Sequence, residues 1–246
     1  CPFGAYLLLV VIIFVFLLST NGTVSPVHLL NIARSAAPLG IVAIGQTIAL
    51  LVGGLDLSVG TTISMVNLVC ASIMNGSNGK IGPAVIISLL LCSLIGLVNG
   101  VIITKFKMQP FLVTLAMSII IEGAYYIYTQ GIPSGNVASS FRYIAEGWVG
   151  KIPVAIIVWG IIWVILSVIL RKTIYGRKLY YTGANPVMAR MSGYHADAIV
   201  ILAYVMTSVL AGIAGLVLSA YIGVASMGIG TEYTLNSIAA SVIGGT

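Results

Sequence analysis

An acidic residue and three glycines interrupt an apolar stretch of this sequence, at residues 53–60 (Gly-Gly-Leu-Asp-Leu-Ser-Val-Gly). The flanking residues are apolar enough to lie in a membrane, where lipid tolerates neither an unpaired carboxylate nor irregular backbone. A break of this kind persists at membrane depth only where it is packed in protein or lines a cavity. Broken helices often mark transport pathways, so the segment predicts a membrane transport function.

The composition excludes a soluble domain. Of the 246 residues, 59% are hydrophobic and 7% are charged, whereas a soluble domain carries roughly 25% charged residues. The formal net charge of +6 does not indicate nucleic-acid binding, because the basic residues cluster in short loops beside apolar spans, as membrane topology requires. We therefore predict one transmembrane domain over residues 1–246. The chain lacks an initiator Met and stops at a second glycine-rich segment, so we expect it to be trimmed at both ends.

The apolar stretches predict an all-α integral membrane protein, a polytopic helical bundle with a broken or re-entrant helix and about eight spans. The expected spans are 4–18, 32–52, 59–74, 83–104, 111–129, 153–170, 199–221 and a last one from about 236. Residues 141–148 have the aromatic character of a short interfacial helix.

Lysine and arginine set the predicted orientation. Lys105 and Lys107 share one loop, and the segment 171–198 holds a larger group of basic residues. Two spans separate these loops, so both lie on one side, which the positive-inside rule makes the cytoplasm. The loops at 75–80 and 131–150 then face outside.

Asp56 has two compatible interpretations. It or Ser58 can cap the helix that follows the break, where the helix dipole also favours a carboxylate. Alternatively, it contacts substrate or forms a gate. Gly53 and Gly54 supply backbone freedom for the turn, and all four residues are candidates for a pathway or gate.

Three further polar residues lie inside apolar spans and complete the set of pathway candidates. Glu122 lies near the middle of the fifth span, where an unpaired carboxylate costs several kcal/mol. We expect it to face protein, either as an interhelical hydrogen-bond partner or as a pathway residue. Gln46 and Asn67 are amides that either join helices or make a path wettable for a polar solute.

The basic segment 171–198 contains a predicted short helix outside the bilayer. Asn185 before Pro186 suits a helix start, and Gly193 suits its end. Val187, Met188 and Met191 give this helix an apolar side. A docking element for a soluble partner fits these residues better than a plain basic loop on anionic headgroups does.

Nothing in the sequence predicts an enzyme. It contains no paired acid and histidine motif, no metal-ligand spacing among its three cysteines, and no phosphate loop. If ATP supplies energy, another chain binds it.

Four segments, in the right order along nearly the whole chain, resemble the permeases of the ribose-type sugar ABC importers. The matching segments are 53–60 (GGxDLSVG), 110–115 (PFxxTL), 176–193 (GR…GxNxxAAxxSG) and 238–246 (IAAxVxGGT). Two departures from the family pattern bear on the identity of the cargo. Relatives often carry Tyr-Glu-Leu-Asp where this chain has Tyr-Thr-Leu-Asn at 233–236. In the region of Glu122, relatives often carry arginine or a neutral residue.

The resemblance implies a multi-pass bacterial inner-membrane permease that imports ribose, a related monosaccharide or autoinducer-2. It implies a second permease copy or a paralogue, an ABC ATPase that binds ATP and Mg²⁺, and a periplasmic or lipid-tethered sugar-binding protein, with no cofactor in this chain. Segment 171–198 would be the coupling loop. Its residues at the ATPase would be Gly183, Asn185, Pro186, Ala189, Arg190 and Gly193. The rival hypothesis is a stand-alone secondary carrier or channel in which Glu122 or Asp56 carries protons.

Overall fold

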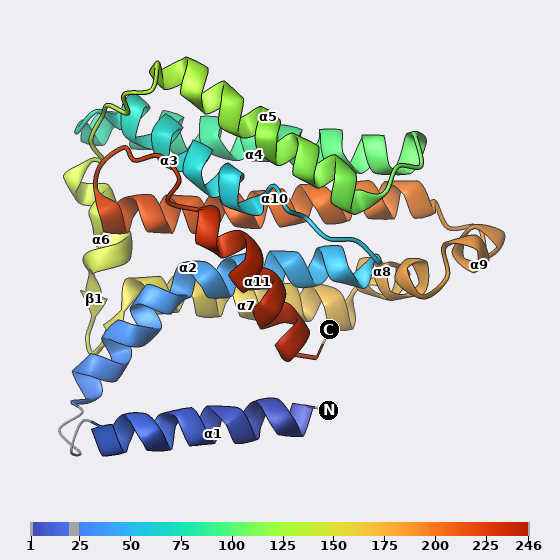
Figure 1. Cartoon of the computed structure of the whole chain (residues 1–246), viewed down its shortest axis with the longest axis horizontal. Coiled ribbons are helices and arrows are strands. Elements are labelled where there is room, and N and C mark those ends of the chain that lie inside the picture. The colour runs from blue at the N-terminus through green and yellow to red at the C-terminus, as the bar shows by residue number, and fades with distance from the viewer. Residues whose placement is uncertain (1, 20–24, 246) are drawn as a thin grey trace.

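The computed structural model describes residues 2–19 and 25–245, which are predominantly α-helical (Figure 1). Each predicted span corresponds to a helix. These helices are α1 (Pro2–Ser19), α2 (Pro26–Leu51), α3 (Val59–Met74), α4 (Ile81–Lys105), α5 (Pro110–Thr129), α7 (Val154–Lys172), α10 (Ala196–Ile222) and α11 (Thr231–Ile243). Among the described residues, five helical segments are long and apolar enough to cross a membrane, and α3 is a shorter apolar helix. The predicted polytopic helical bundle is confirmed.

Two helices begin earlier than their hydropathy predicts, because their starts are set by turn chemistry. Helix α2 begins at Pro26 rather than at residue 32, where the Ser25 side chain accepts a hydrogen bond from the Val27 N–H and Pro26 occupies the first turn. Helix α11 begins at Thr231, after Gly230, rather than near residue 236. Both starts contain polar residues that a hydropathy criterion leaves out.

The connections contain short elements. Helix α6 (Ser139–Glu146) lies where the interfacial helix is predicted, and β1 (Trp148–Val149) pairs antiparallel with β2 (Ile152–Pro153), which sequence reasoning missed. The 3₁₀ helix η1 (Asn78–Lys80) precedes α4. Helices α8 (Ile174–Ala184) and α9 (Pro186–Met191) form the basic segment. The two basic loops lie at the same end of the bundle, opposite α6, as the predicted topology requires (Figure 1).

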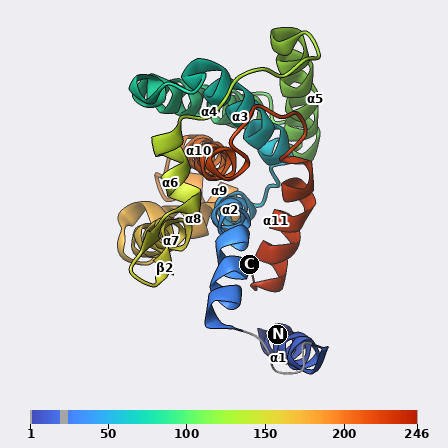
Figure 2. The same ribbon diagram turned by 90° about the vertical axis from the view of Figure 1, so that its left-hand side faces the viewer.

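Helix α10 is the centre of the bundle. It packs against α2, α3, α4 and α6, as the end-on view shows (Figure 2). Gly96 and Gly100 of α4 lie directly against the α10 backbone at Tyr204 and Ile201, so a side chain at either glycine would overlap it. Helices α5 and α11 lie at one edge, α7 lies at the other, and α1 lies outside the bundle (Figure 2).

The chain is non-helical at two places that meet at α3. Residues 52–58 connect α2 to α3, and residues 223–230 return from the end of α10 to the start of α11 (Figure 1). The starts of α3 and α11 touch, because a Cβ added at Gly230 would meet the Gly60 carbonyl oxygen. The Ser64 hydroxyl also accepts a 3.0 Å hydrogen bond from the Gly230 N–H. Helix α3 therefore holds both non-helical segments in place.

Candidate translocation and coupling site

The break turns tightly where it leaves α2. Gly53, with φ of 78°, follows the last turn of α2, a conformation that favours glycine. Asp56 is fully buried, and its Oδ1 accepts hydrogen bonds from the Ser58 N–H at 2.9 Å and from the Ser58 hydroxyl at 2.5 Å. Ser58 is the N-cap residue of α3, but its side chain makes no capping bond. Of the two expected caps, Asp56 is the one that accepts a backbone N–H at the start of α3, whereas the Ser58 hydroxyl donates to Asp56.

Neighbouring helices satisfy the backbone of the break. Gln46 of α2 faces the backbone of Asp56, and its amide, in the orientation that satisfies both groups, accepts from the Asp56 N–H and donates to the Asp56 carbonyl at 3.2 Å each. Thr114 of α5 donates to the Leu55 carbonyl at 3.2 Å. These contacts replace the water that lipid does not supply.

Three buried oxygen atoms around the break lack a hydrogen-bond partner in the described chain: Asp56 Oδ2, Asn99 Oδ1 and the Tyr204 hydroxyl. Asn99 of α4 uses its amide nitrogen to donate to the Ser58 hydroxyl at 3.2 Å. The Tyr204 hydroxyl of α10 lies against Gly54, where a Cβ would overlap it. Unpartnered buried polar atoms are uncommon in proteins, and others in this chain lie elsewhere in the bundle, at Ser88 and Ser208 among them.

A cavity of about 600 Å³ adjoins the break at the edge of the bundle that α5 and α11 form. Gly53, Gly54 and Leu55 line it together with Gln109, Pro110 and Phe111 at the start of α5 and residues of α11. Asp56 and Ser58 are not part of this lining, since they point into the bundle. Only the glycine end of the break therefore faces the cavity.

Asn67 lies apart from the break and fixes the second non-helical segment. Its amide nitrogen donates to the Val224 carbonyl and to the Ser219 hydroxyl at 3.2 Å each, and its oxygen accepts from the Ser226 N–H at 2.8 Å. Each polar atom of this buried amide thus has a partner.

The predicted helix in the basic segment is confirmed as α9, with the predicted cap. Asn185 Oδ1 accepts hydrogen bonds from the Val187 and Met188 N–H groups at 3.0 Å each, and Pro186 occupies the first helical position. Gly193 follows the helix with φ of 79°. Ala189 is buried, whereas Met188 and Met191 are exposed.

The basic segment of α8 and α9 lies against the end of α2, next to the break. A Cβ at Gly183 would overlap the Leu51 carbonyl oxygen and approach the Val52 Cα at 3.4 Å, so α8 packs directly on the end of α2. A cavity of about 230 Å³ separates the remaining parts of the two segments, with Val52, Pro186 and Tyr204 among its lining residues. Segment 183–193 thus lies against the end of α2, directly before the break.

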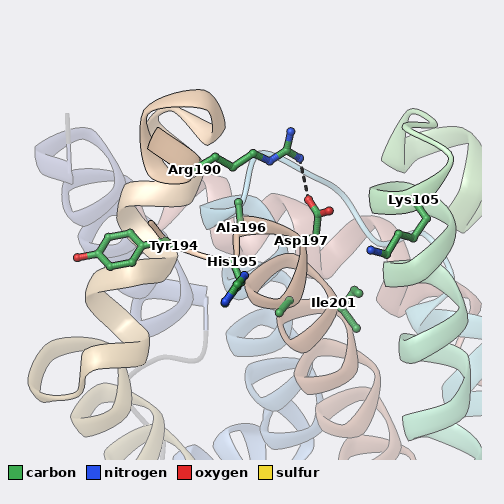
Figure 3. Close-up of a pocket in the computed structure, with 8 residues that line it drawn as sticks. Lys105, Arg190, Tyr194, His195, Ala196, Asp197 and Ile201 are labelled. Atoms are coloured by element: carbon green, nitrogen blue, oxygen red, sulfur yellow. Dashed lines mark hydrogen bonds and ion pairs between the residues drawn. The ribbon is translucent and has the colours of Figure 1, made fainter. Parts of the chain in front are cut away.

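Arg190 of α9 pairs with Asp197 in the first turn of α10. Its Nη2 lies 2.7 Å from the Asp197 Oδ1 (Figure 3). Lys105 and His195 line the adjoining pocket of about 380 Å³. The ion pair therefore ties α9 to α10, the central helix of the bundle.

Comparison with known proteins identifies the family. Residues 28–246 match the family described as "Branched-chain amino acid transport system / permease component". The chain belongs to this family. It is 33% identical to the ribose import permease of Bacillus subtilis (strain 168), over 99% of this chain and 76% of that protein. It is 36% identical to the ribose import permease of Escherichia coli (strain K12), over 97% of this chain and 75% of that protein.

A galactose/methyl galactoside import permease of Salmonella typhimurium (strain LT2) is 28% identical over 98% of this chain and 77% of that protein. No solved structure matches the chain. The resemblance to ribose-type permeases is confirmed, and the protein is an integral membrane permease, the membrane-spanning component of a transport system.

Glu122, a predicted pathway residue, lies on the surface of the permease bundle rather than inside it. It is exposed on α5, between the buried Ile121 and the exposed Gly123. Within this chain it does not face the protein interior, contrary to our expectation. It lies 12 residues beyond Pro110, or about 18 Å along the helix. A protein partner for this carboxylate must come from outside the described chain.

Sequence reasoning did not select Tyr204, Thr114 and Asp197 as site residues of the permease. Thr114 lies in the PFxxTL segment. This motif marks the residue as one of interest but does not predict which group it contacts. Tyr204 and Asp197 carry no local signal, because their roles arise from the packing of α10 against segments that are distant in sequence.

Proposed function

We propose that this permease forms the translocation path of an ATP-driven importer of ribose or a related monosaccharide, autoinducer-2 included. The observation that carries the proposal is similarity over 97–99% of the chain to proteins named as ribose and galactose import permeases. ATP and Mg²⁺ bind to a partner ATPase, and a periplasmic or lipid-tethered binding protein delivers the sugar. The permease itself catalyses no reaction.

The geometry supports a coupling role for segment 171–198. The exposed apolar side chains of α9, at Val187, Met188 and Met191, provide a surface for the ATPase. Movement of α8 and α9 reaches the helices beside the break through two contacts. One is the contact of Gly183 in α8 with the end of α2, and the other is the pair of Arg190 in α9 with Asp197 in α10. ATP-driven closure of the ATPases then shifts the break and alternates the access of the path.

A second permease copy or a paralogue completes the path in this proposal. The cavity beside Gly53 and Gly54 opens at the edge where α5 and α11 lie, and Glu122 is exposed on α5. Pairing through this edge removes the carboxylate from lipid, where it is costly. It also encloses the cavity between the two copies.

Reconstitution in liposomes tests the proposal. The full permease, with the ATPase and the sugar-binding protein of its own transport system, is expected to take up radiolabelled D-ribose or D-galactose only when ATP is hydrolysed. ATPase activity is expected to rise with the loaded binding protein. The rival carrier, which the unpaired carboxylate oxygen of Asp56 favours, predicts instead that permease alone takes up the solute under a proton gradient. That outcome would reject the ATP-driven importer.

A further inference from the structure

A separate pocket lies at the opposite end of the bundle from α9, beside α6. It has a volume of about 170 Å³ and is formed by residues of α2, α6, α7, α10 and α11. Its polar and aromatic lining comes from Arg34 and Ser35 of α2, Tyr221 of α10 and Tyr233 of α11. The loop charges predict that this end faces outside.

Arg34 is an unusual residue to find in this position. It lies eight residues into α2, or about 12 Å along the helix, and it is only partly exposed. The ion pairs of the described chain use Arg142 and Arg190, so no carboxylate pairs with Arg34 there. Its Nε is buried without a hydrogen-bond partner. Ionisable residues within membrane spans are costly and mark substrate or ion pathways.

The surroundings of Arg34 indicate the chemistry of a ligand. The guanidinium carbon lies 5.7 Å from the centroid of the Tyr221 ring, so the cation is held beside an aromatic face. The rest of the pocket wall is mainly apolar, from Pro38, Ala145, Ala155 and two residues of α10. The guanidinium of Arg34 is planar and has several N–H donors, so it fits a ligand that presents adjacent oxygen atoms. The aromatic and apolar walls fit a ligand that also has a C–H face.

The size of the pocket limits the ligand. Its volume of about 170 Å³ is below the roughly 300–1,000 Å³ of pockets for drug-sized ligands. One monosaccharide ring combines this small size with adjacent hydroxyl oxygens and an apolar ring face. An inorganic anion has the oxygens but uses neither the aromatic nor the apolar wall.

We propose that Arg34, Tyr221 and Tyr233 form a binding site for one monosaccharide at the outer end of the permease. The inference rests on the proposed sugar transport and adds the place where the permease itself holds the sugar. Helices α2 and α11 contribute both to this pocket and to the cavity beside the break. A sugar at the outer pocket thus contacts the same helices that line the cavity at the opposite end.

The test measures sugar binding to the permease–ATPase complex in nanodiscs without the binding protein. D-ribose and D-galactose are titrated by calorimetry against the wild type, Arg34→Gln and Tyr221→Leu. Each variant is expected to weaken sugar binding at least about tenfold, the loss that follows when a charge-assisted hydrogen bond or an aromatic contact is removed. Lys80→Gln, a charge loss on an exposed residue at the same end, is expected to leave the affinity unchanged.

A second measurement separates binding from folding. Arg34→Lys keeps the charge but loses the planar fork, so it is expected to insert normally and still raise the half-saturating concentration of loaded binding protein for uptake. Wild-type affinity in both Arg34 variants would overturn the inference, as would binding of inorganic sulfate in place of either sugar. If ATP-dependent sugar uptake persists in either case, only the outer site fails. If the wild type shows no such uptake, the proposed function fails instead.

Discussion

At the residue scale, the break depends on the hydrogen bonds that Asp56 accepts. Both bonds from Ser58 end on one carboxylate oxygen, and the amide oxygen of asparagine can accept the same two. Asp56→Asn is therefore expected to keep near-normal thermal stability and uptake. Asp56→Leu leaves two donors without their acceptor and is expected to lose about 1–3 kcal/mol of stability.

The two Asp56 variants are compared with the wild type by their melting temperatures in detergent and by their rates of sugar uptake in liposomes. If asparagine is as damaging as leucine, the charge itself is required, and the proton-carrier hypothesis gains. If neither variant has an effect, the break is a passive turn.

Gly183 permits the closest contact between the coupling segment and the break. A methyl group there would overlap the Leu51 carbonyl oxygen. Because backbone cannot yield as a flexible side chain does, Gly183→Ala is expected to destabilise the permease by about 1–3 kcal/mol and to reduce stimulated ATPase activity. Gly82→Ala in α4 is the matched control, since a Cβ there meets no atom within 4 Å. Equal melting temperatures for the two variants would show that α8 moves away without penalty.

At the element scale, the Arg190–Asp197 pair links α9 to α10. The Arg190 and Asp197 side chains are 53% and 36% exposed, and solvent screening limits the contribution of such a pair to at most about 1 kcal/mol. Its expected role is to transmit motion. Arg190→Glu and Asp197→Arg are each expected to lower loaded-binding-protein-stimulated ATPase activity several-fold while the melting temperature changes little. The double variant, which restores opposite charges, is expected to recover most of that activity.

Lys172→Glu is the control for the Arg190 variant, because it reverses an exposed charge in the same basic segment. Failure of the double variant to recover, with both single variants impaired, would indicate that Arg190 contacts the ATPase directly.

The elements themselves were largely predictable from the sequence. Helix α3 has its predicted bounds, because the break, and the left-handed Asn75 that follows the helix, limit an apolar run on both sides. Helix α9 has its predicted bounds because Asn185, Pro186 and Gly193 carry local capping signals. The contacts of the site were not predictable in the same way. Gln46 is recognisable as a polar residue in a span, but its partner, the backbone of Asp56, is known only when α2 and the break are packed together.

At the scale of the whole molecule, one of the most costly groups has no partner among the residues that the structure describes. Glu122 is exposed on α5, at the edge where the break and its cavity also open. A sequence reveals that such a carboxylate needs a partner, but not which chain supplies it. Hydropathy predicts where the spans lie along the chain. Whether lipid or protein covers this edge depends on how the transporter assembles.

Cysteine accessibility tests that assembly. Glu122→Cys is expected to react slowly with a lipid-soluble maleimide in the assembled transporter, because a second permease covers α5. Ile161→Cys is the control, since Ile161 is 54% exposed on α7, at the opposite edge of the bundle. It is expected to react several times faster, and dissociation of the complex in harsh detergent is expected to equalise the two rates. Equal rates in the intact complex would place Glu122 in lipid, and the edge of α5 and α11 would then not be the permease–permease interface.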